Sequence, residues 1–166
     1  MVDVFTPAKR SEVMSAIRGR GNKSTELLLA SAMRKAGITG WRRHVVFKLD
    51  LKRTGHESPH GRRQSSVIRP DFSFRKERLA VFVDGCFWHR CPLHQTVPKN
   101  NADFWATKLD SNVIRDKAVN AAFRRKGWSV MRIWEHELKT PEQAIRRLRR
   151  RLSIRSLGSQ PPRAST

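Results

Sequence analysis

A segment of fourteen residues, 81–94, holds the side chains of this chain best suited to chemistry. It contains both cysteines of the chain, two of its six histidines and one carboxylate. These residues are Asp84, Cys86, His89, Cys91 and His94. Thiolates and imidazoles are the ligands that structural zinc takes, and an imidazole near its ordinary pKa can accept a proton from an attacking water. The segment therefore predicts a zinc site beside a site of proton transfer.

The zinc prediction rests on the spacing Cys86-x4-Cys91-x2-His94. A structural zinc site needs four ligands, and these residues supply three. We expect a second histidine to be the fourth: His136 is our choice, and His89 is the alternative, although His89 would then be lost as a base. Two close cysteines in a cytosolic chain are more typical of metal ligands than of a disulfide. Two unliganded thiols packed in the core are the other interpretation.

Carboxylates in and beside apolar strands predict a second, catalytic metal site. Asp71 interrupts an apolar run, where a buried charge is costly unless it is paired, and Asp84 ends the next predicted strand. Glu26, on a predicted helix, is the third acidic candidate. Magnesium binds oxygen ligands and keeps several waters, so one or two carboxylates suffice. The alternative for Asp71 is an ion pair with one of the many arginines.

Aromatic residues flank these candidates. The pair Phe87-Trp88 lies inside the Cys/His segment and outside any strand pattern. Such side chains can wedge between base pairs and kink DNA, and ordinary core packing is the alternative. We expect core positions for Phe104, Phe123, Trp128 and Trp134.

The charge of the chain favours a polyanionic partner. Lys and Arg number 35 against 14 Asp and Glu, a net charge of +21 over 166 residues. Neutralising phosphates releases counterions and drives binding to nucleic acid. No apolar run approaches the roughly 20 residues that cross a bilayer, so we expect no membrane association and a cytoplasmic, nucleoid-associated protein. A lineage that favours arginine is the competing explanation for the charge.

Hydrophobic periodicity and turn signals predict an α/β fold, a mixed β-sheet flanked by helices. The expected helices are 24–35, 101–126 and one that begins near 141, and the expected strands are 41–49, 67–74, 79–83 and 128–134. Residues 75–78 are a polar turn, so the strands on either side of it should form a hairpin.

The predicted organisation is one domain, 24–152, with less ordered additions. Residues 1–23 form a basic N-terminal arm, 50–66 a polar loop rich in Gly and Pro, and 153–166 a disordered tail.

Several motifs in this order resemble the very-short-patch repair endonucleases, enzymes that nick one DNA strand beside a T·G mismatch. The resemblance runs from about Arg10 to Leu138. It rests on Arg69-Pro70-Asp71-Phe72, on Asp84-Gly85-Cys86-Phe87-Trp88-His89-x-Cys91-Pro92-x-His94, on Phe104-Trp105-x-x-Lys108, on Asn112-Val113-x-Arg115-Asp116 and on Trp134-Glu135-His136. The central motif is the most specific. Residues 50–66 depart from the family as an insertion ahead of Asp71, which bears on substrate choice.

The resemblance implies a fold like that of type II restriction endonucleases and a role for each matching residue. The implied magnesium ligands are Asp71 and the backbone carbonyl of Val83. The implied catalytic residues are His89 and Glu26, with Asp116 placed to orient His89, and Asp84 is a further catalytic candidate. The implied intercalating residues are Phe87, Trp88 and Trp105. The implied zinc ligands are Cys86, Cys91, His94 and His136.

The sequence therefore leads to the hypothesis of a magnesium-dependent, mismatch-specific nicking endonuclease with structural zinc. Its partner would be double-stranded DNA with a T·G mismatch, with other mismatch-repair proteins as further partners, and we expect a monomer. A restriction-like endonuclease that cuts intact duplex is the first alternative. A zinc-stabilised DNA-binding protein without activity is the second.

Overall fold

A four-stranded mixed sheet forms the centre of the protein. The computed structural model describes residues 25–51, 65–94, 96 and 101–157. The sheet has the order β1-β4-β5-β6. Its strands are β1 (Trp41–Arg43), β4 (Phe72–Phe74), β5 (Leu79–Asp84) and β6 (Ser129–Trp134). The contacts β1–β4 and β4–β5 are antiparallel, and β5–β6 is parallel. The predicted hairpin is therefore present as β4–β5.

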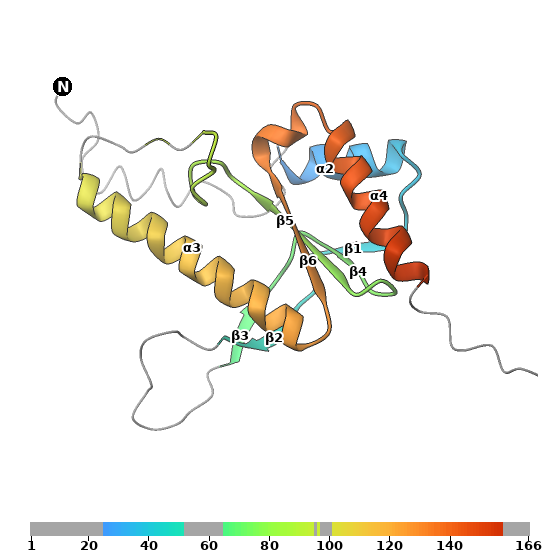
Figure 1. Cartoon of the computed structure of the whole chain (residues 1–166), viewed down its shortest axis with the longest axis horizontal. Coiled ribbons are helices and arrows are strands. Elements are labelled where there is room, and N and C mark those ends of the chain that lie inside the picture. The colour runs from blue at the N-terminus through green and yellow to red at the C-terminus, as the bar shows by residue number, and fades with distance from the viewer. Residues whose placement is uncertain (1–24, 52–64, 95, 97–100, 158–166) are drawn as a thin grey trace, which may run out of the picture.

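Helices cover both faces of this sheet (Figure 1). They are α2 (Glu26–Lys35), α3 (Ala102–Arg125) and α4 (Glu142–Leu157), with a short 3-10 helix, η1 (Glu135–Leu138). In Figure 1, α2 and α4 lie together on one side of the strands and α3 crosses the other side. This arrangement confirms the predicted mixed sheet with flanking helices.

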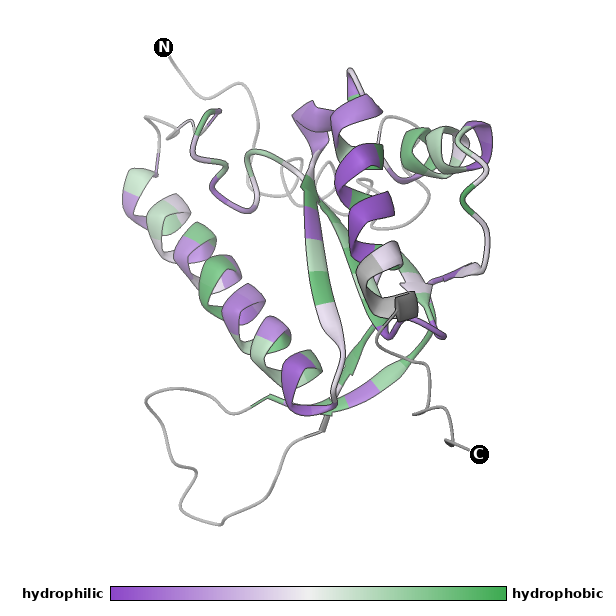
Figure 2. Cartoon of the chain, turned by 45° about the vertical axis from the view of Figure 1, so that its right-hand side comes forward, coloured by the Kyte–Doolittle hydropathy of each residue, from purple (hydrophilic) through white to green (hydrophobic). Residues whose placement is uncertain are grey.

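Each face of the sheet has its own hydrophobic core. The first core packs α2 and α4 on the sheet through residues such as Leu29, Met33, Phe72, Ile133 and Leu148. The second packs α3 on the sheet through Ala80, Val119, Ala122 and Phe123. Figure 2 shows α3 and α4 with hydrophobic and hydrophilic positions alternating along each helix. Such spacing lets one stripe of each helix cover the sheet.

Two predicted long strands are each broken in the middle, so the prediction of single strands over 41–49 and 67–74 was wrong. A separate two-stranded sheet is formed by β2 (Phe47–Asp50) and β3 (Ser65–Ile68). The register nevertheless continues across the gap, because Arg43 lies opposite Phe72 and Phe47 lies opposite Ile68. Residues 44–46 and 69–71 thus face each other as one interruption in a longer antiparallel ladder.

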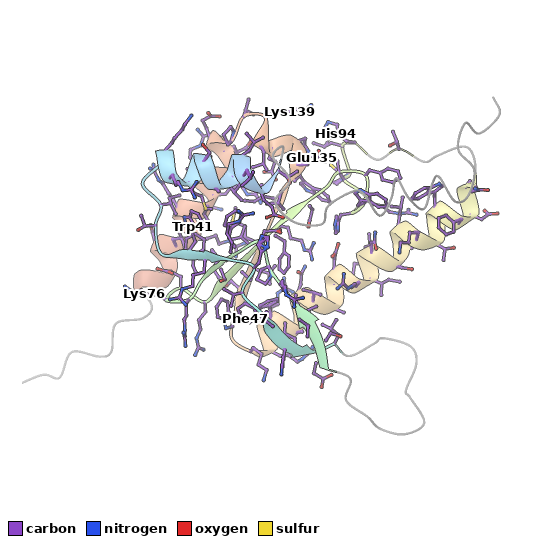
Figure 3. The ribbon with its side chains drawn as sticks, turned by 180° about the vertical axis from the view of Figure 1, so that it is seen from behind. Trp41, Phe47, Lys76, His94, Glu135 and Lys139 are labelled. Carbon is purple, nitrogen blue, oxygen red and sulfur yellow. The ribbon has the colours of Figure 1, made fainter. Side chains whose placement is uncertain are left out.

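The interruption of the ladder has local causes, and at this point each strand passes from one hydrophobic core to the other. Pro70 has no N–H to donate to a ladder, and His44 has a left-handed backbone with φ of 54°. Trp41 packs against the first core, whereas Phe47 packs against the second. Figure 3 labels both side chains and shows them in different parts of the fold.

Other boundaries differ less from the predictions. α2, α3 and β6 agree with the predicted elements within two residues, but α4 continues to Leu157, past the predicted domain end at 152. The predicted arm 1–23, most of the insertion (52–64) and residues 158–166 lie outside the described residues. Phe104 is 60% exposed, so its predicted core position was wrong. Among the described helices, none is long and apolar enough to span a membrane.

Candidate active site

A cavity of about 370 Å³ lies where the antiparallel ladder is interrupted. Its walls come from both sides of the interruption, from the end of β5, from β6 and from α3. The polar residues that line it are His44, Arg69, Asp71, Asp84, His89, Arg115, Asp116 and Arg132. The cavity therefore combines acidic groups, two imidazoles and three guanidinium groups, the groups that a phosphodiester and a metal ion would require.

One acidic cluster at this cavity consists of Glu26, His44 and Asp71, whose possible ligand atoms lie within 4.8 Å of one another. Glu26 begins α2 and is only 5% exposed. Its Oε2 lies 2.7 Å from His44 Nε2 and accepts a hydrogen bond from Arg43 Nη2 at 2.5 Å. The Val83 N–H donates to Asp71 Oδ2 at 2.7 Å, which places β5 against this carboxylate.

Burial raises the pKa of Asp71 from its ordinary 3.8 to about 7. The Val83 N–H opposes this shift, while the neighbouring carboxylate of Glu26 adds to it by charge and by hydrogen bonding. Two carboxylates this close in a partly buried place repel each other unless a proton or a cation lies between them. The cluster is therefore suited to a cation.

A second acidic group is organised by Arg132. Its Nη1 donates to both oxygens of Asp84, at 2.7 and 2.8 Å, and its Nη2 donates to Asp116 Oδ1 at 3.0 Å. The other oxygen of Asp116 lies 2.6 Å from His89 Nδ1. A continuous chain of charge-assisted hydrogen bonds thus runs from Asp84 on β5 to the imidazole of His89.

The pKa values of this group follow from the same contacts. Burial alone would lower the pKa of His89, but its hydrogen bond to Asp116 and the charges of Asp84 and Asp116 outweigh burial, so the pKa is raised. Burial raises the pKa of Asp84, and Arg132 opposes that rise. Asp84 is 3% exposed and has both oxygens bonded to Arg132. Asp84 therefore fixes the guanidinium group of Arg132, which in turn bonds to Asp116.

The loop that carries His89 is fastened to α3 at several points. Asn112 Nδ2 donates to the Trp88 carbonyl at 3.0 Å, and Arg90 Nη2 donates to the Ala106 carbonyl at 3.2 Å. With the contact between His89 and Asp116, these bonds come from successive turns of one helix. The second hydrophobic core then fixes α3 on the sheet, so packing sets the position of the imidazole.

The four predicted zinc ligands converge at the other end of this loop. Cys86, Cys91, His94 and His136 offer ligand atoms within 4.8 Å of one another. Cys86 Sγ lies 3.2 Å from His136 Nδ1, and Cys91 Sγ lies 3.6 Å from the same atom and 3.7 Å from His94 Nδ1. Tetrahedral zinc separates sulfur and nitrogen ligands by about 3.5 Å. Figure 3 shows His94 near Glu135, the residue that precedes His136.

The donor set and its spacing therefore fit zinc. Burial raises the pKa of the Cys86 thiol, Cys91 adds to the rise, and His136 opposes it. A bound cation would favour the thiolate form of Cys86 over the thiol. The structure brings together His136 rather than His89 with the cysteines, because His89 contacts Asp116 instead.

The three predicted intercalating residues form one aromatic cluster. The ring of Phe87 lies 5.1 Å from Trp88 and 5.4 Å from Trp105, and the two tryptophan rings are 6.0 Å apart, centre to centre. Phe104 extends the cluster at 5.4 Å from Trp105. The half-buried rings of Phe87, Trp88 and Trp105 join the Cys/His loop to the start of α3.

Sequence reasoning missed two residues of the site, His44 and Arg132. Every candidate catalytic residue, namely Glu26, Asp71, Asp84, His89 and Asp116, lies in the cavity wall or in contact with a residue of that wall. Arg132 carried a usable signal, because it is a charged residue inside the apolar strand Val130–Ile133. His44 carried none, because it was assigned to a regular strand.

Comparison with known proteins agrees with this site. A family model described as DNA mismatch endonuclease Vsr matches residues 60–95. The type II nicking enzyme V.NaeI of Lentzea aerocolonigenes is 38% identical over 130 residues, which cover 78% of this chain and 69% of that protein. The DNA mismatch endonuclease Vsr of Escherichia coli K12 is 32% identical over 146 residues, 86% of this chain and 80% of that protein. The chain belongs to the Vsr family.

Membership of the Vsr family confirms the resemblance drawn from the sequence motifs. The protein is a DNA endonuclease, a hydrolase of phosphodiester bonds that belongs to DNA repair. Its substrate is DNA, in agreement with the charge of +21.

Proposed function

We propose that this Vsr-family protein nicks one strand of DNA beside the T of a T·G mismatch and uses magnesium at Asp71. The observation that carries the proposal is that Asp71 and His89 line one cavity together with Arg69 and Arg115. The cavity thus offers a metal ligand, a base and two phosphate-binding cations. We also propose that the fold is of the restriction-endonuclease type, as the sequence motifs imply.

The residues at Asp71 fit magnesium. The carboxylate of Asp71 and the backbone carbonyl of Val83 are oxygen donors, the class that magnesium prefers. Glu26 adds a second carboxylate in the same cluster. A bound magnesium ion would polarise a phosphate oxygen and lower the pKa of a coordinated water.

In this proposal His89 accepts the proton of the attacking water. Asp116 Oδ2 lies 2.6 Å from Nδ1, so a neutral His89 would keep its proton on Nδ1 and carry the free electron pair on Nε2. Nε2 would take the proton as the water oxygen bonds to phosphorus, and the bond from phosphorus to the leaving oxygen breaks. Arg69 and Arg115 would hold the phosphate, since one guanidinium group can donate two parallel hydrogen bonds to two phosphate oxygens.

The aromatic cluster supports mismatch recognition. Phe87, Trp88 and Trp105 could insert between base pairs, and a mismatched pair costs less to unstack than a matched one. We propose that zinc bound by Cys86, Cys91, His94 and His136 fixes the loop that carries the first two rings.

The test is strand-specific cleavage of labelled duplexes that carry one T·G mismatch in varied flanking sequence. The account expects a nick beside the mismatched T with magnesium and none with chelator or in the T·A control. Equal cutting of matched duplexes would favour a restriction-like enzyme. Binding without cutting would contradict the nuclease assignment of this site.

Replacing His89 tests the base directly. General-base removal slows a reaction by about 10²- to 10⁴-fold, so we expect His89→Ala to lose nicking by that factor while T·G duplex binding changes little. The matched control is His94→Ala, which should lower zinc content and thermal stability. A His89→Ala enzyme that nicks at the wild-type rate would remove His89 from the mechanism.

A further inference from the structure

We propose that His44 acts with Glu26 and Asp71 as a nitrogen ligand, so that this cluster binds manganese or a similar first-row transition cation more tightly than magnesium. The inference rests on the proposed function for the catalytic use of the cation, and it concerns which cation the site prefers.

The three side chains converge from separate elements. Glu26 comes from α2, Asp71 from the residues just before β4, and His44 from those just after β1. Their possible ligand atoms lie within 4.8 Å of one another, and His44 Nε2 lies 2.7 Å from Glu26 Oε2. Ligand atoms that share one cation at 2.0–2.2 Å are about 3 Å apart. His44 and Glu26 are already this close, and Asp71 would have to move toward them to share a cation.

The backbone holds His44 in this place. By the shared register of the broken ladder His44 lies opposite Asp71, and its N–H donates to the Asp71 carbonyl at 3.4 Å. Its left-handed backbone, φ 54°, belongs to the interruption that opens the cavity. His44 and Asp71 both line that cavity of about 370 Å³, so a cation could reach them from solvent.

The chemistry of the donor set favours a transition cation. Magnesium prefers oxygen ligands throughout, whereas an imidazole nitrogen adds affinity for manganese and the metals that follow it in the first row. In the competing arrangement, a protonated His44 and Arg43 both neutralise Glu26 as ion pairs. These two arrangements differ in whether a histidine nitrogen binds the metal.

Pulsed electron paramagnetic resonance of Mn²⁺ bound to the zinc-loaded full chain distinguishes them. We expect coupling to a directly bound ¹⁴N, replaced by ¹⁵N coupling in protein grown on ¹⁵N-histidine. The coupling should vanish in His44→Asn and persist in His89→Ala, the other imidazole of the cavity. Asparagine tolerates the left-handed backbone of residue 44, so this variant keeps the fold while it removes the imidazole.

Affinities measured by titration provide the second measure. His44→Asn should weaken Mn²⁺ binding by about tenfold or more and Mg²⁺ binding by less than about threefold. Bound Mn²⁺ with only oxygen coordination, or a coupling that His44→Asn leaves unchanged, would overturn the proposal. Should that variant fail to fold, the labelled wild type and His89→Ala still decide, since they reveal whether a histidine other than His89 is bound.

The outcome is independent of nicking. Nitrogen coordination without any cleavage would reject the proposed function and leave the cation site standing. Cleavage with oxygen-only coordination would reject the cation site and leave the proposed function standing.

Discussion

Two acidic groups line the same cavity, and they are neutralised in different ways. Asp84 and Asp116 share the guanidinium group of Arg132. Asp71 has a backbone N–H and a neighbouring carboxylate, and its pKa rises to about 7. Glu26 is paired with Arg43 and His44, but no described ion pair reaches Asp71 itself.

This difference in how the carboxylates are neutralised fits two different roles, positioning and metal binding. A carboxylate whose charge is already balanced can orient an imidazole, as Asp116 does for His89. A carboxylate whose charge is unbalanced is stabilised by an added cation, because the cation removes the repulsion that raises its pKa. We therefore propose positioning as the role of the Arg132 group and metal binding as the role of the Asp71 group.

The largest expected effect on stability comes from Arg132→Met. Removing one partner of a buried ion pair costs about 3–5 kcal/mol, and here Asp84 would lose its ion-pair partner while Asp116 would keep only His89. We expect a loss of that size in the free energy of unfolding measured with urea. The control, Arg43→Met, should cost less, because His44 still contacts Glu26. Equal losses in the two variants would contradict the contrast between the groups.

Asp116→Asn should act on catalysis through His89. Asp116 raises the pKa of His89 by its hydrogen bond and its charge. Without this hydrogen bond and charge the pKa of His89 falls, so the rise of the nicking rate with pH should move to lower pH. The maximal rate should also drop by about 10²-fold. Asp110→Asn, an exposed acid of the same helix paired with Arg90, is the control and should leave both unchanged. An unmoved pH profile would remove Asp116 from this role.

The pKa of Asp71 predicts a smaller effect on stability with pH. Between pH 4 and pH 7 the folded protein keeps a proton that the unfolded chain has released, so the free energy of unfolding falls as pH rises through this window. The expected fall is about 2 kcal/mol, reduced by solvent in the open cavity. It should be measured on zinc-loaded protein without added divalent cation.

Two comparisons sharpen that measurement. Asp71→Asn should remove the part of the pH dependence that Asp71 causes, and added magnesium should restore stability near pH 7 by mass action. A stability that rises from pH 4 to pH 7 by the same amount in wild type and Asp71→Asn would contradict the pKa assigned to Asp71.

Much of the fold was predictable from sequence because each element carried a periodic pattern and a stop signal. The long helix α3 ends at Arg125, just before Gly127, whose φ is 74°. The hairpin β4–β5 follows from two apolar runs around a polar turn. The broken ladder was not predictable, since alternating residues such as Trp41 and Phe47 look alike whether they enter one core or two.

The site was predictable where unusual residue types occur together, as in the Cys/His segment. It was not predictable where a common residue gains its role from a distant partner. Arg132 is one of 35 basic residues, and only the parallel contact of β6 with β5 places it beside Asp84. His44 depends on a left-handed backbone that a lone histidine does not signal.

The most direct test of this division is the single-turnover nicking rate of Asp71→Asn and Asp84→Asn as a function of magnesium concentration. The account predicts that Asp71→Asn does not nick the T·G duplex at any magnesium concentration. It predicts that Asp84→Asn nicks more slowly but reaches its half-maximal rate at the wild-type magnesium concentration. A tenfold higher magnesium requirement in Asp84→Asn, or wild-type nicking by Asp71→Asn, would contradict it.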